Sequence, residues 1–202
     1  MLQNKTVFVT GASGLLAINV IEDLLLQQYN VIGLLRNKKK FPLPENESLE
    51  TVIIRPPLVY GAGVKGNFKR LLDLVKWSIP LPFGAIYNSR SMVSVENLVD
   101  LISTCLWHPN AANSTFLVSD DHNLSTPDLI SLIAKTGGYN IKIIKVPLIL
   151  LKFAFLCTRK LGLYDRLCRS MVVDCEHTKK QLDWRPTHHI DDSIKSCWDD
   201  FK

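Results

Sequence analysis

Apolar residues in the first forty positions form a short run, then a stripe at helical spacing, then a second short run. Residues 6–10 (TVFVT) are β-formers that end at Gly11, and residues 29–36 (YNVIGLLR) form the second run. The stripe between them consists of Leu16, Val20, Ile21, Leu24 and Leu25. The order strand, glycine turn, helix, strand predicts a βαβ unit with two parallel strands and a right-handed crossover.

The remainder of the chain continues this alternation. The patterns predict strands at 51–55, 91–95 and 114–120, helices at 67–77 and 96–107, and a loop at 56–66. Ser125 is predicted to cap a further helix, with Pro127 in its first turn and Asp128 three residues after the cap. From Ile141 onward we expect a short strand and several helices. The pattern as a whole indicates an α/β fold.

Composition narrows the class of protein without adding a motif. The 202 residues are 47% hydrophobic and carry a formal net charge of +5, which suits a globular protein that binds an acidic small molecule. The basic run 38–40 is typical of a solvated loop, and we expect no nucleic-acid partner. The five cysteines form an odd set without a CxxC pair, which favours reduced thiols and a cytoplasmic location.

Neither a metal site nor a membrane span is predicted. Cys175, His177, His188 and His189 match no zinc-binding spacing. Residues 146–157 (VPLILLKFAFLC) are the most apolar stretch, but a lysine interrupts them and a transmembrane helix needs roughly 20 residues. We therefore expect a buried or an interfacial helix there. The first apolar run leads directly into a glycine turn, so no signal peptide is predicted either.

The glycine turn is the first candidate binding site. Gly11 and Gly14, with Ala17 at the third position, follow a G-x-x-G-x-x-G spacing between a predicted strand and a predicted helix. The first glycine permits the tight turn, the second lets the backbone approach a pyrophosphate, and the third small residue lets helix and strand pack closely. The helix N-terminus would offer N–H groups and a partial positive charge to phosphates. An ordinary β-turn-α junction is the alternative.

The end of the second strand bears on the choice of cofactor. A dinucleotide fold that prefers NAD usually carries an acidic residue there, which bonds the adenosine ribose. Here the strand ends in Leu35 and Arg36. Arg36 could meet the 2′-phosphate of NADP, or it could be an ordinary solvated arginine. The cofactor is therefore predicted as NAD or NADP.

Four segments together resemble one family. "TVFVTGASG", "TVIIRPPLVYGAG", "NSRSMVSVENLVDLI" and "LDWRP" occur in the order found in extended short-chain dehydrogenases/reductases. Within that group they are similar to the NAD-dependent epimerase/dehydratase family, in particular to UDP-glucose 4-epimerase-like enzymes of surface-polysaccharide synthesis. The resemblance covers residues 4–36 and about 51–200.

The resemblance implies roles for particular residues. Gly11, Ser13, Gly14 and the backbone of Leu15 and Leu16 would cradle the cofactor diphosphate. Pro56 would lie beside the nicotinamide. Asn67 would contact the nucleotide of the substrate, and Arg90 would hold the diphosphate of a nucleotide sugar. An arginine suits the last role because its planar fork pairs with phosphate oxygens, although Arg90 could also be a purely structural residue.

The catalytic pair that the resemblance requires is absent. The family uses a tyrosine four residues before a lysine on one helix face, where the ammonium lowers the pKa of the phenol for proton exchange. The residues four positions after the five tyrosines are Gly33, Val64, Ser91, Ile143 and Cys168. No catalytic residue is therefore predicted.

The junction at residues 36–57 accounts for this absence. Only the fourteen residues Asn37 to Glu50 separate the second strand from the strand that resembles the sixth of the family. One βαβ unit needs roughly 30 residues, so the intervening strands cannot fit. In a sheet of order 3-2-1-4-5-6 their loss leaves a gap at the centre, and the sheet must re-close or remain poorly packed.

We thus predict a Rossmann-like parallel sheet without its central strands and a small C-terminal α/β substrate portion. Residues 1–66 with parts of 85–120 would form the truncated cofactor portion, and 67–84 with 121–202 the substrate portion. The expected protein is a catalytically deficient nucleotide-sugar epimerase/dehydratase homologue. The alternatives are a non-catalytic NAD(P)- or nucleotide-sugar-binding protein and a subunit completed by another chain. A nucleotide sugar is the expected partner, and a homo-oligomer is left open.

Overall fold

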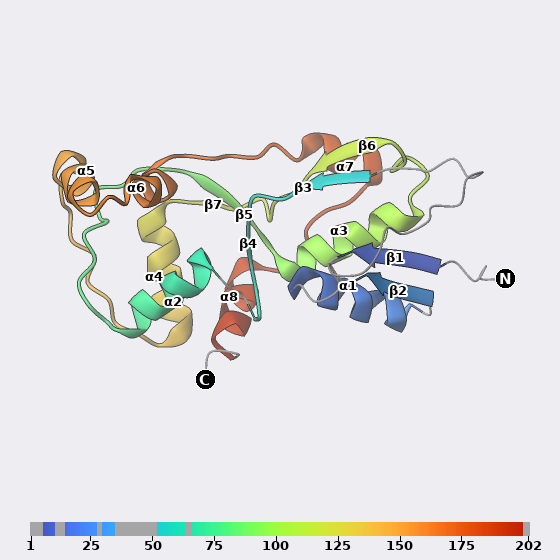
Figure 1. Cartoon of the computed structure of the whole chain (residues 1–202), viewed down its shortest axis with the longest axis horizontal. Coiled ribbons are helices and arrows are strands. Elements are labelled where there is room, and N and C mark those ends of the chain that lie inside the picture. The colour runs from blue at the N-terminus through green and yellow to red at the C-terminus, as the bar shows by residue number, and fades with distance from the viewer. Residues whose placement is uncertain (1–5, 11–14, 28–29, 35–51, 64–65, 200–202) are drawn as a thin grey trace.

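The computed structural model describes residues 6–10, 15–27, 30–34, 52–63 and 66–199 (Figure 1). The strands are β1 (Thr6–Thr10), β2 (Asn30–Leu34), β3 (Val52–Arg55), β4 (Leu58–Tyr60), β5 (Arg90–Ser94), β6 (Ser114–Leu117) and β7 (Asn123–Leu124). The helices are α1 (Leu15–Leu26), α2 (Asn67–Lys76), α3 (Val95–Trp107), α4 (Thr126–Gly137), α5 (Leu148–Cys157), α6 (Leu161–Cys168), α7 (Glu176–Leu182) and α8 (Ile190–Asp199). This alternation confirms the predicted α/β fold.

The predicted βαβ unit forms at the start of the chain. Strands β1 and β2 pair in parallel, with Thr6 opposite Asn30 and Thr10 opposite Leu34, and α1 connects them. Helix α1 lies against α3 because Val20 and Leu24 are buried in one apolar cluster with Val95 and Val99. The α1–α3 contact therefore attaches this unit to the rest of the molecule.

Two further sheets follow the junction. Strand β3 pairs in parallel with β6, while β4 pairs in parallel with β5, and β5 pairs antiparallel with β7. Strand β4 corrects the prediction of a loop at 56–66, because Leu58 and Val59 pair opposite Met92 and Val93. The predicted strand at 114–120 ends at Leu117, and in place of the strand expected from Ile141 there is an isolated bridge between Leu81 and Ile143.

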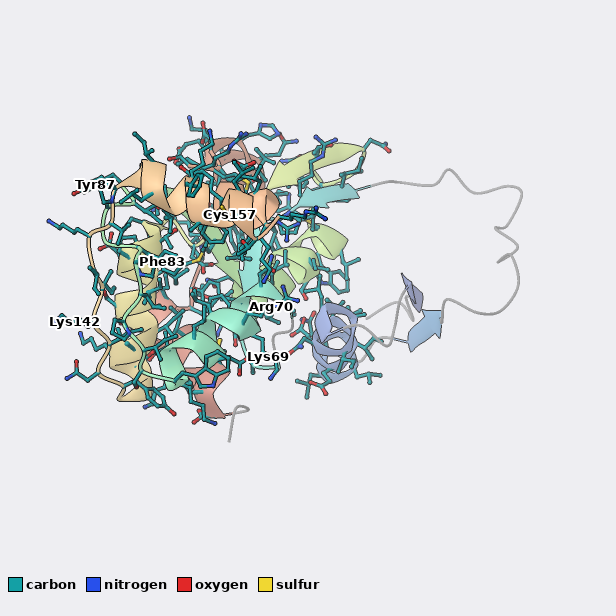
Figure 2. All side chains as sticks on the ribbon, turned by 60° about the vertical axis from the view of Figure 1, so that its left-hand side comes forward. Lys69, Arg70, Phe83, Tyr87, Lys142 and Cys157 are labelled. Atoms are coloured by element: carbon teal, nitrogen blue, oxygen red, sulfur yellow. The ribbon has the colours of Figure 1, made fainter. Side chains whose placement is uncertain are left out.

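The central gap in the sheet stays open. Among the described residues no ladder joins β1 to β3: β1 pairs with β2, and β3 pairs with β6. Figures 1 and 2 show β3 and β6 on one side of α3, and β1 and β2 on the other. Of the two outcomes predicted for the shortened sheet, direct pairing of the first strand with the strand at 51–55 is therefore wrong for this structure.

The largest apolar core lies on the C-terminal side, where α4 packs against both α2 and α8. Trp198 of α8 is buried and donates from its indole nitrogen to the Ile133 carbonyl oxygen at 3.1 Å. A Cβ atom at Gly137 would lie 2.5 Å from the Trp198 ring, so only glycine permits this approach of α8. The predicted cap of α4 is confirmed, because the Ser125 hydroxyl accepts from the Asp128 amide at 3.2 Å.

Helix α5 contains most of the apolar stretch 146–157, and only its Leu151 side chain is buried. The alternative of a buried helix is therefore wrong. No helix within the described ranges is both long and apolar enough to cross a bilayer.

The α1–α3 contact generates a stability prediction. Replacing fully buried Leu24 with alanine should lower the free energy of unfolding by about 2–5 kcal/mol, because the cavity would form in the interface that holds the βαβ unit. The matched change of Leu25, which is 56% exposed, should cost less than about 0.5 kcal/mol. Urea denaturation followed by circular dichroism measures both values. Equal losses would contradict this role for the α1–α3 contact.

Candidate functional site

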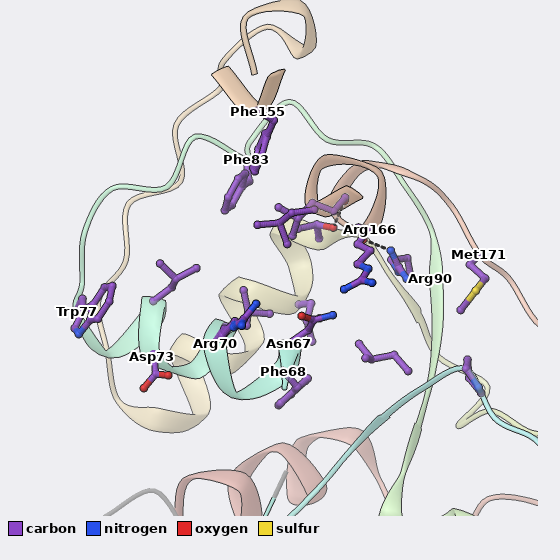
Figure 3. Close-up of a pocket in the computed structure, with 18 of the residues that line it drawn as sticks. Asn67, Phe68, Arg70, Asp73, Trp77, Phe83, Arg90, Phe155, Arg166 and Met171 are labelled. Atoms are coloured by element: carbon purple, nitrogen blue, oxygen red, sulfur yellow. Dashed lines mark hydrogen bonds between the residues drawn. The ribbon is translucent and has the colours of Figure 1, made fainter. Parts of the chain in front are cut away.

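A cavity of about 700 Å³ opens between α2, α4, α5, α6 and the start of β5 (Figure 3). Its size falls within the range of small-molecule binding sites. The residues that line it are Pro56, Pro57, Leu58, Asn67, Phe68, Arg70, Leu71, Asp73, Leu74, Trp77, Phe83, Arg90, Thr126, Leu129, Phe155, Leu163, Arg166, Leu167 and Met171. Most of this lining is apolar, and its charged groups are three arginines and one aspartate.

Three of the residues singled out from sequence lie on this cavity. Pro56 follows β3, Asn67 begins α2 and Arg90 begins β5, and all three belong to the lining. The fold thus brings together positions that the sequence separates by up to 34 residues, of which Pro56 is implied to lie beside the nicotinamide and the other two to contact the substrate. Their individual roles stay predictions.

The residues predicted to cradle the cofactor cannot be placed in the same way. Gly11, Ser13, Gly14 and Arg36 lie outside the described residues. Leu15 begins α1, and Leu16 packs against the buried residues that join α1 to α3.

Arg90 is held by the protein yet keeps one unused donor. Its Nη1 donates to the Arg166 carbonyl oxygen at the end of α6. Its Nε is buried and has no hydrogen-bond partner among the described residues. Burial lowers the pKa of the Arg90 guanidinium from its ordinary value. A buried N–H without an acceptor costs free energy, and this Nε is shielded from solvent rather than exposed to the cavity.

Asn88 fixes the wall that carries Arg90. Its side-chain nitrogen donates to the Thr126 hydroxyl at 3.2 Å and to the Leu167 carbonyl oxygen at 3.0 Å, while its side-chain oxygen accepts from the Thr126 amide at 2.8 Å. The Thr126 hydroxyl also donates to the Leu167 carbonyl oxygen at 2.6 Å. These bonds join the start of α4 and the end of α6 to the segment before β5, so the cavity is preformed.

Sequence reasoning missed several residues of the lining. Figure 3 shows Phe83 and Phe155 at one end of the cavity, Asn67 and Arg70 along α2, and Arg166 beside Arg90. The sequence gives a partial signal for Arg70 only, because Asn67 and Arg70 are three residues apart on one predicted helix and therefore share a face. Phe83 and Phe155 lie on a loop and a helix that only tertiary packing brings together.

Tyr60 lies behind the cavity and is committed to a buried polar network. Its ring stacks on Phe68 with 5.6 Å between centroids, and its hydroxyl donates to Asp120 Oδ2 at 2.6 Å. Asn97 Nδ2 donates to Asp120 Oδ1 at 2.8 Å, and the Ser94 amide donates to Oδ2 at 2.9 Å. Burial, with the neighbouring Asp120 carboxylate, raises the pKa of Tyr60 well above its ordinary value. These contacts make Tyr60 a structural residue.

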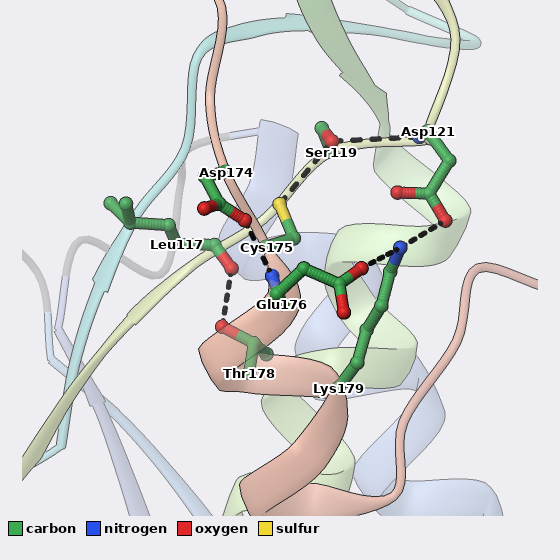
Figure 4. Close-up of polar contacts among 8 residues, drawn as sticks. All are labelled: Leu117, Ser119, Asp121, Asp174, Cys175, Glu176, Thr178 and Lys179. Carbon is green, nitrogen blue, oxygen red and sulfur yellow. Dashed lines mark hydrogen bonds and ion pairs between the residues drawn. The ribbon is translucent and has the colours of Figure 1, made fainter.

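The cluster around Cys175 is also structural. Its thiol lies 3.3 Å from the Ser119 hydroxyl, and burial raises the pKa of Cys175 (Figure 4). On α7, Thr178 donates to the Leu117 carbonyl oxygen at 2.6 Å and Lys179 pairs with Asp121 at 2.8 Å. These contacts attach α7 to the end of β6. Within the described ranges no group of three or more His, Cys, Asp or Glu residues could hold a metal ion.

The sequence of this chain is similar to that of a known enzyme. No protein-family model matches the chain. A UDP-glucose 4-epimerase of Vibrio cholerae is 44% identical over 159 residues, which are 78% of this chain and 48% of the relative. The chain thus spans about half the length of the curated relative that it matches.

Solved structures show the same fold at low identity. A UDP-glucose 4-epimerase of Thermotoga maritima, determined with UDP-glucose, superposes with a TM-score of 0.69 at 14% identity, over 98% of both chains. A UDP-glucuronic acid 4-epimerase of Bacillus cereus, determined in complex with NAD, superposes with a TM-score of 0.70 at 12% identity, over 97% of this chain and 98% of the other.

The chain therefore has the Rossmann-like α/β fold of these neighbours. The sequence match makes the chain a relative of a UDP-glucose 4-epimerase.

The buried network predicts a pH dependence of stability. Burial raises the pKa of Asp120 above its usual range, and hydrogen bonds from Tyr60, Asn97 and Ser94 offset this shift only in part. The folded protein therefore binds this proton more tightly than the unfolded chain. Its contribution to stability is fully present below a pH of about 4 and is lost as the pH rises through the folded-state pKa.

The substitution Asp120→Asn removes this titration. The stability of the wild type relative to D120N should therefore fall as the pH rises from acidic to neutral. Urea denaturation of both proteins across that range measures the difference. A difference that stayed constant or increased with pH would contradict the raised pKa.

Proposed function

We propose that this chain retains the nucleotide-sugar-binding part of a UDP-sugar 4-epimerase-like fold and has no turnover by itself. The supporting observation is the chemistry of the cavity. Three arginines line it, yet among the described residues its lining contains no Tyr, His, Cys or Lys that could exchange a proton near neutral pH. An epimerase-like enzyme needs both a binding site and such a proton donor and acceptor, and the described lining of the cavity offers groups only for binding.

The cavity suits a nucleoside diphosphate sugar. The guanidinium groups of Arg90 and Arg166 can pair with phosphate oxygens. Phe83 and Phe155 offer apolar aromatic faces, on which a base can stack. The UDP-sugar preference is inferred from the relatives, since one is a UDP-glucose 4-epimerase and a structural neighbour was determined with UDP-glucose.

NAD or NADP is the proposed cofactor, and the backbone of β1, α1 and β2 fits it. Strands β1 and β2 are parallel and α1, which begins at Leu15, connects them, as a dinucleotide-binding βαβ unit requires. Pro56 lines the substrate cavity, which fits its implied place beside the nicotinamide. In an intact family member the bound cofactor supplies hydride transfer to and from the sugar. This chain's own contribution would be to bind and orient the two ligands.

The missing catalyst is best explained by loss of an internal block. The structural alignments extend over nearly all of this chain and of its epimerase neighbours, and β1 does not pair with β3. Both observations fit a deletion at residues 35–51, within the shortened connection. A cytoplasmic location and a link to surface-polysaccharide synthesis, which the family resemblance implies, are part of the same proposal.

The binding half of the proposal predicts an effect of Arg90→Ala. A hydrogen bond to a charged group contributes about 1.5–3 kcal/mol, so R90A should bind UDP roughly ten- to hundredfold more weakly. Isothermal titration calorimetry measures the affinity. Arg185→Ala removes an exposed arginine outside the cavity and should leave it unchanged. Equal binding by wild type and R90A, or no binding of UDP by the wild type, would refute the assignment of the cavity.

The catalytic half predicts that no epimerisation occurs. The isolated chain, incubated with NAD⁺ or NADP⁺ and UDP-glucose or UDP-galactose, should leave the sugar unchanged, because no tyrosine–lysine pair is present. Chromatography of the nucleotide sugars checks this result. Conversion of either sugar by the isolated chain would contradict the proposed catalytic deficiency.

A second candidate function is a subunit that another chain completes. Strand β3 supports it, because Ile53 is 44% exposed although parallel strands are normally covered on both faces. A partner that supplied the missing strands and the tyrosine would cover this surface. Sedimentation velocity and co-purification test the idea, and activity of a monomer without any partner would exclude it.

A further inference from the structure

Helix α5 exposes an apolar face to solvent. Ile149 is 82% exposed, Phe153 63% and Leu156 54%. These residues follow the spacing i, i+4, i+7 and therefore form one stripe along the helix. Leu151 is buried and Phe155 lines the cavity, so the opposite side of α5 attaches it to the protein. The stripe is thus an outward surface on a helix that is already folded and anchored.

The charged residues that flank this stripe in the sequence are all basic. Between Asp128 and Asp165 the chain has no acidic residue but six basic ones. All six are exposed, and none takes part in the ion pairs of the described residues: Lys135, Lys142, Lys145, Lys152, Arg159 and Lys160. Asp165, the first acid after them, pairs with Arg169 at 3.0 Å. The apolar stripe therefore lies in a sequence segment without acidic residues, and Lys152, Arg159 and Lys160 are the basic residues on α5 or directly after it.

The position of α5 separates this surface from the gap in the sheet. Figure 1 shows α5 and α6 at one end of the molecule and β1 and β2 at the other, and Figure 2 shows α5 along the outer surface. A chain that filled the gap between β1 and β3 would therefore not cover α5. The exposed stripe needs a separate explanation.

We propose that α5 binds the surface of an anionic lipid bilayer, with Ile149, Phe153 and Leu156 in the acyl boundary. Helices that lie in the membrane interface combine an apolar face with lysine and arginine, which attract anionic headgroups. Lys152 lies beside the stripe, and its aliphatic stem can extend along the apolar face while its ammonium group reaches the headgroups. With 10 residues, α5 is too short to span a bilayer and long enough to lie on one.

Charge complementarity favours a lipid surface over other occupants. A second copy of the chain in a symmetric dimer would bring the same basic residues against each other. Nucleic acid would satisfy the charge but would leave the isoleucine, phenylalanine and leucine side chains without an apolar partner. An anionic bilayer satisfies both.

Vesicle sedimentation tests the proposal independently of any nucleotide binding. The full chain should sediment with vesicles of phosphatidylglycerol and phosphatidylcholine but not with phosphatidylcholine alone, and salt should weaken the binding. Leu156→Glu should reduce binding at least about tenfold. Leu25→Glu on α1 is the matched control, because Leu25 is 56% exposed, and it should bind like the wild type.

Charge variants test the contribution of the basic residues to membrane binding. Replacing Lys152, Arg159 and Lys160 with glutamine should weaken binding by about fivefold per residue, whereas the same change of Lys180, Arg185 and Lys195 should have little effect. Circular dichroism and UDP affinity should be unchanged in all these variants, which shows that they fold.

Three results would overturn the proposal. The first is an absence of vesicle binding by the wild type at low salt. The second is equal binding by L156E and the wild type. The third is a dimer that forms without lipid and that L156E abolishes. This result would assign the stripe to self-association. Binding of polyglutamate through α5, without binding of vesicles, would likewise assign it to an acidic polypeptide.

Discussion

The length of the connection between β2 and β3 is the constraint on which the rest of this structure depends. Residues 35–51 cannot form two further βαβ units, so β3 cannot be joined to β1 through intermediate strands. Because no ladder links these two strands among the described residues, the sheet is divided, and the first βαβ unit relies on the packing of α1 against α3. The open centre follows from chain length rather than from any local sequence preference.

The same constraint separates binding from catalysis. The cavity is built from α2, α4, α5, α6 and the start of β5, all of which lie after the shortened connection. Asn88 and Thr126 hold its wall through bonds that do not involve β1 or β2. The acid–base pair of the family belongs to the block that we infer to be lost. Under the proposed function, a deletion at this point would remove the catalyst and leave the cavity intact.

Much of this could be predicted from sequence, because local patterns determine most of the elements. The stripe at Leu16 to Leu25 and the cap at Ser125 gave α1 and the start of α4 within a few residues. Strand β4 was missed because the proline and glycine residues around Leu58–Tyr60 favour a loop, and pairing with β5 overrides that preference. Family resemblance singled out Asn67 and Arg90, which line the cavity, whereas Phe83, Phe155 and Arg166 meet there only through tertiary packing.

Binding of a nucleotide sugar without its conversion can be tested in one sample. Saturation-transfer NMR of UDP-glucose with the full chain and NAD⁺ reports binding through the uracil and ribose protons, and it reports turnover through the anomeric proton of the sugar. The account predicts transfer to the nucleotide protons and an unchanged glucose signal. The appearance of a galactose signal, or the absence of any transfer, would contradict it.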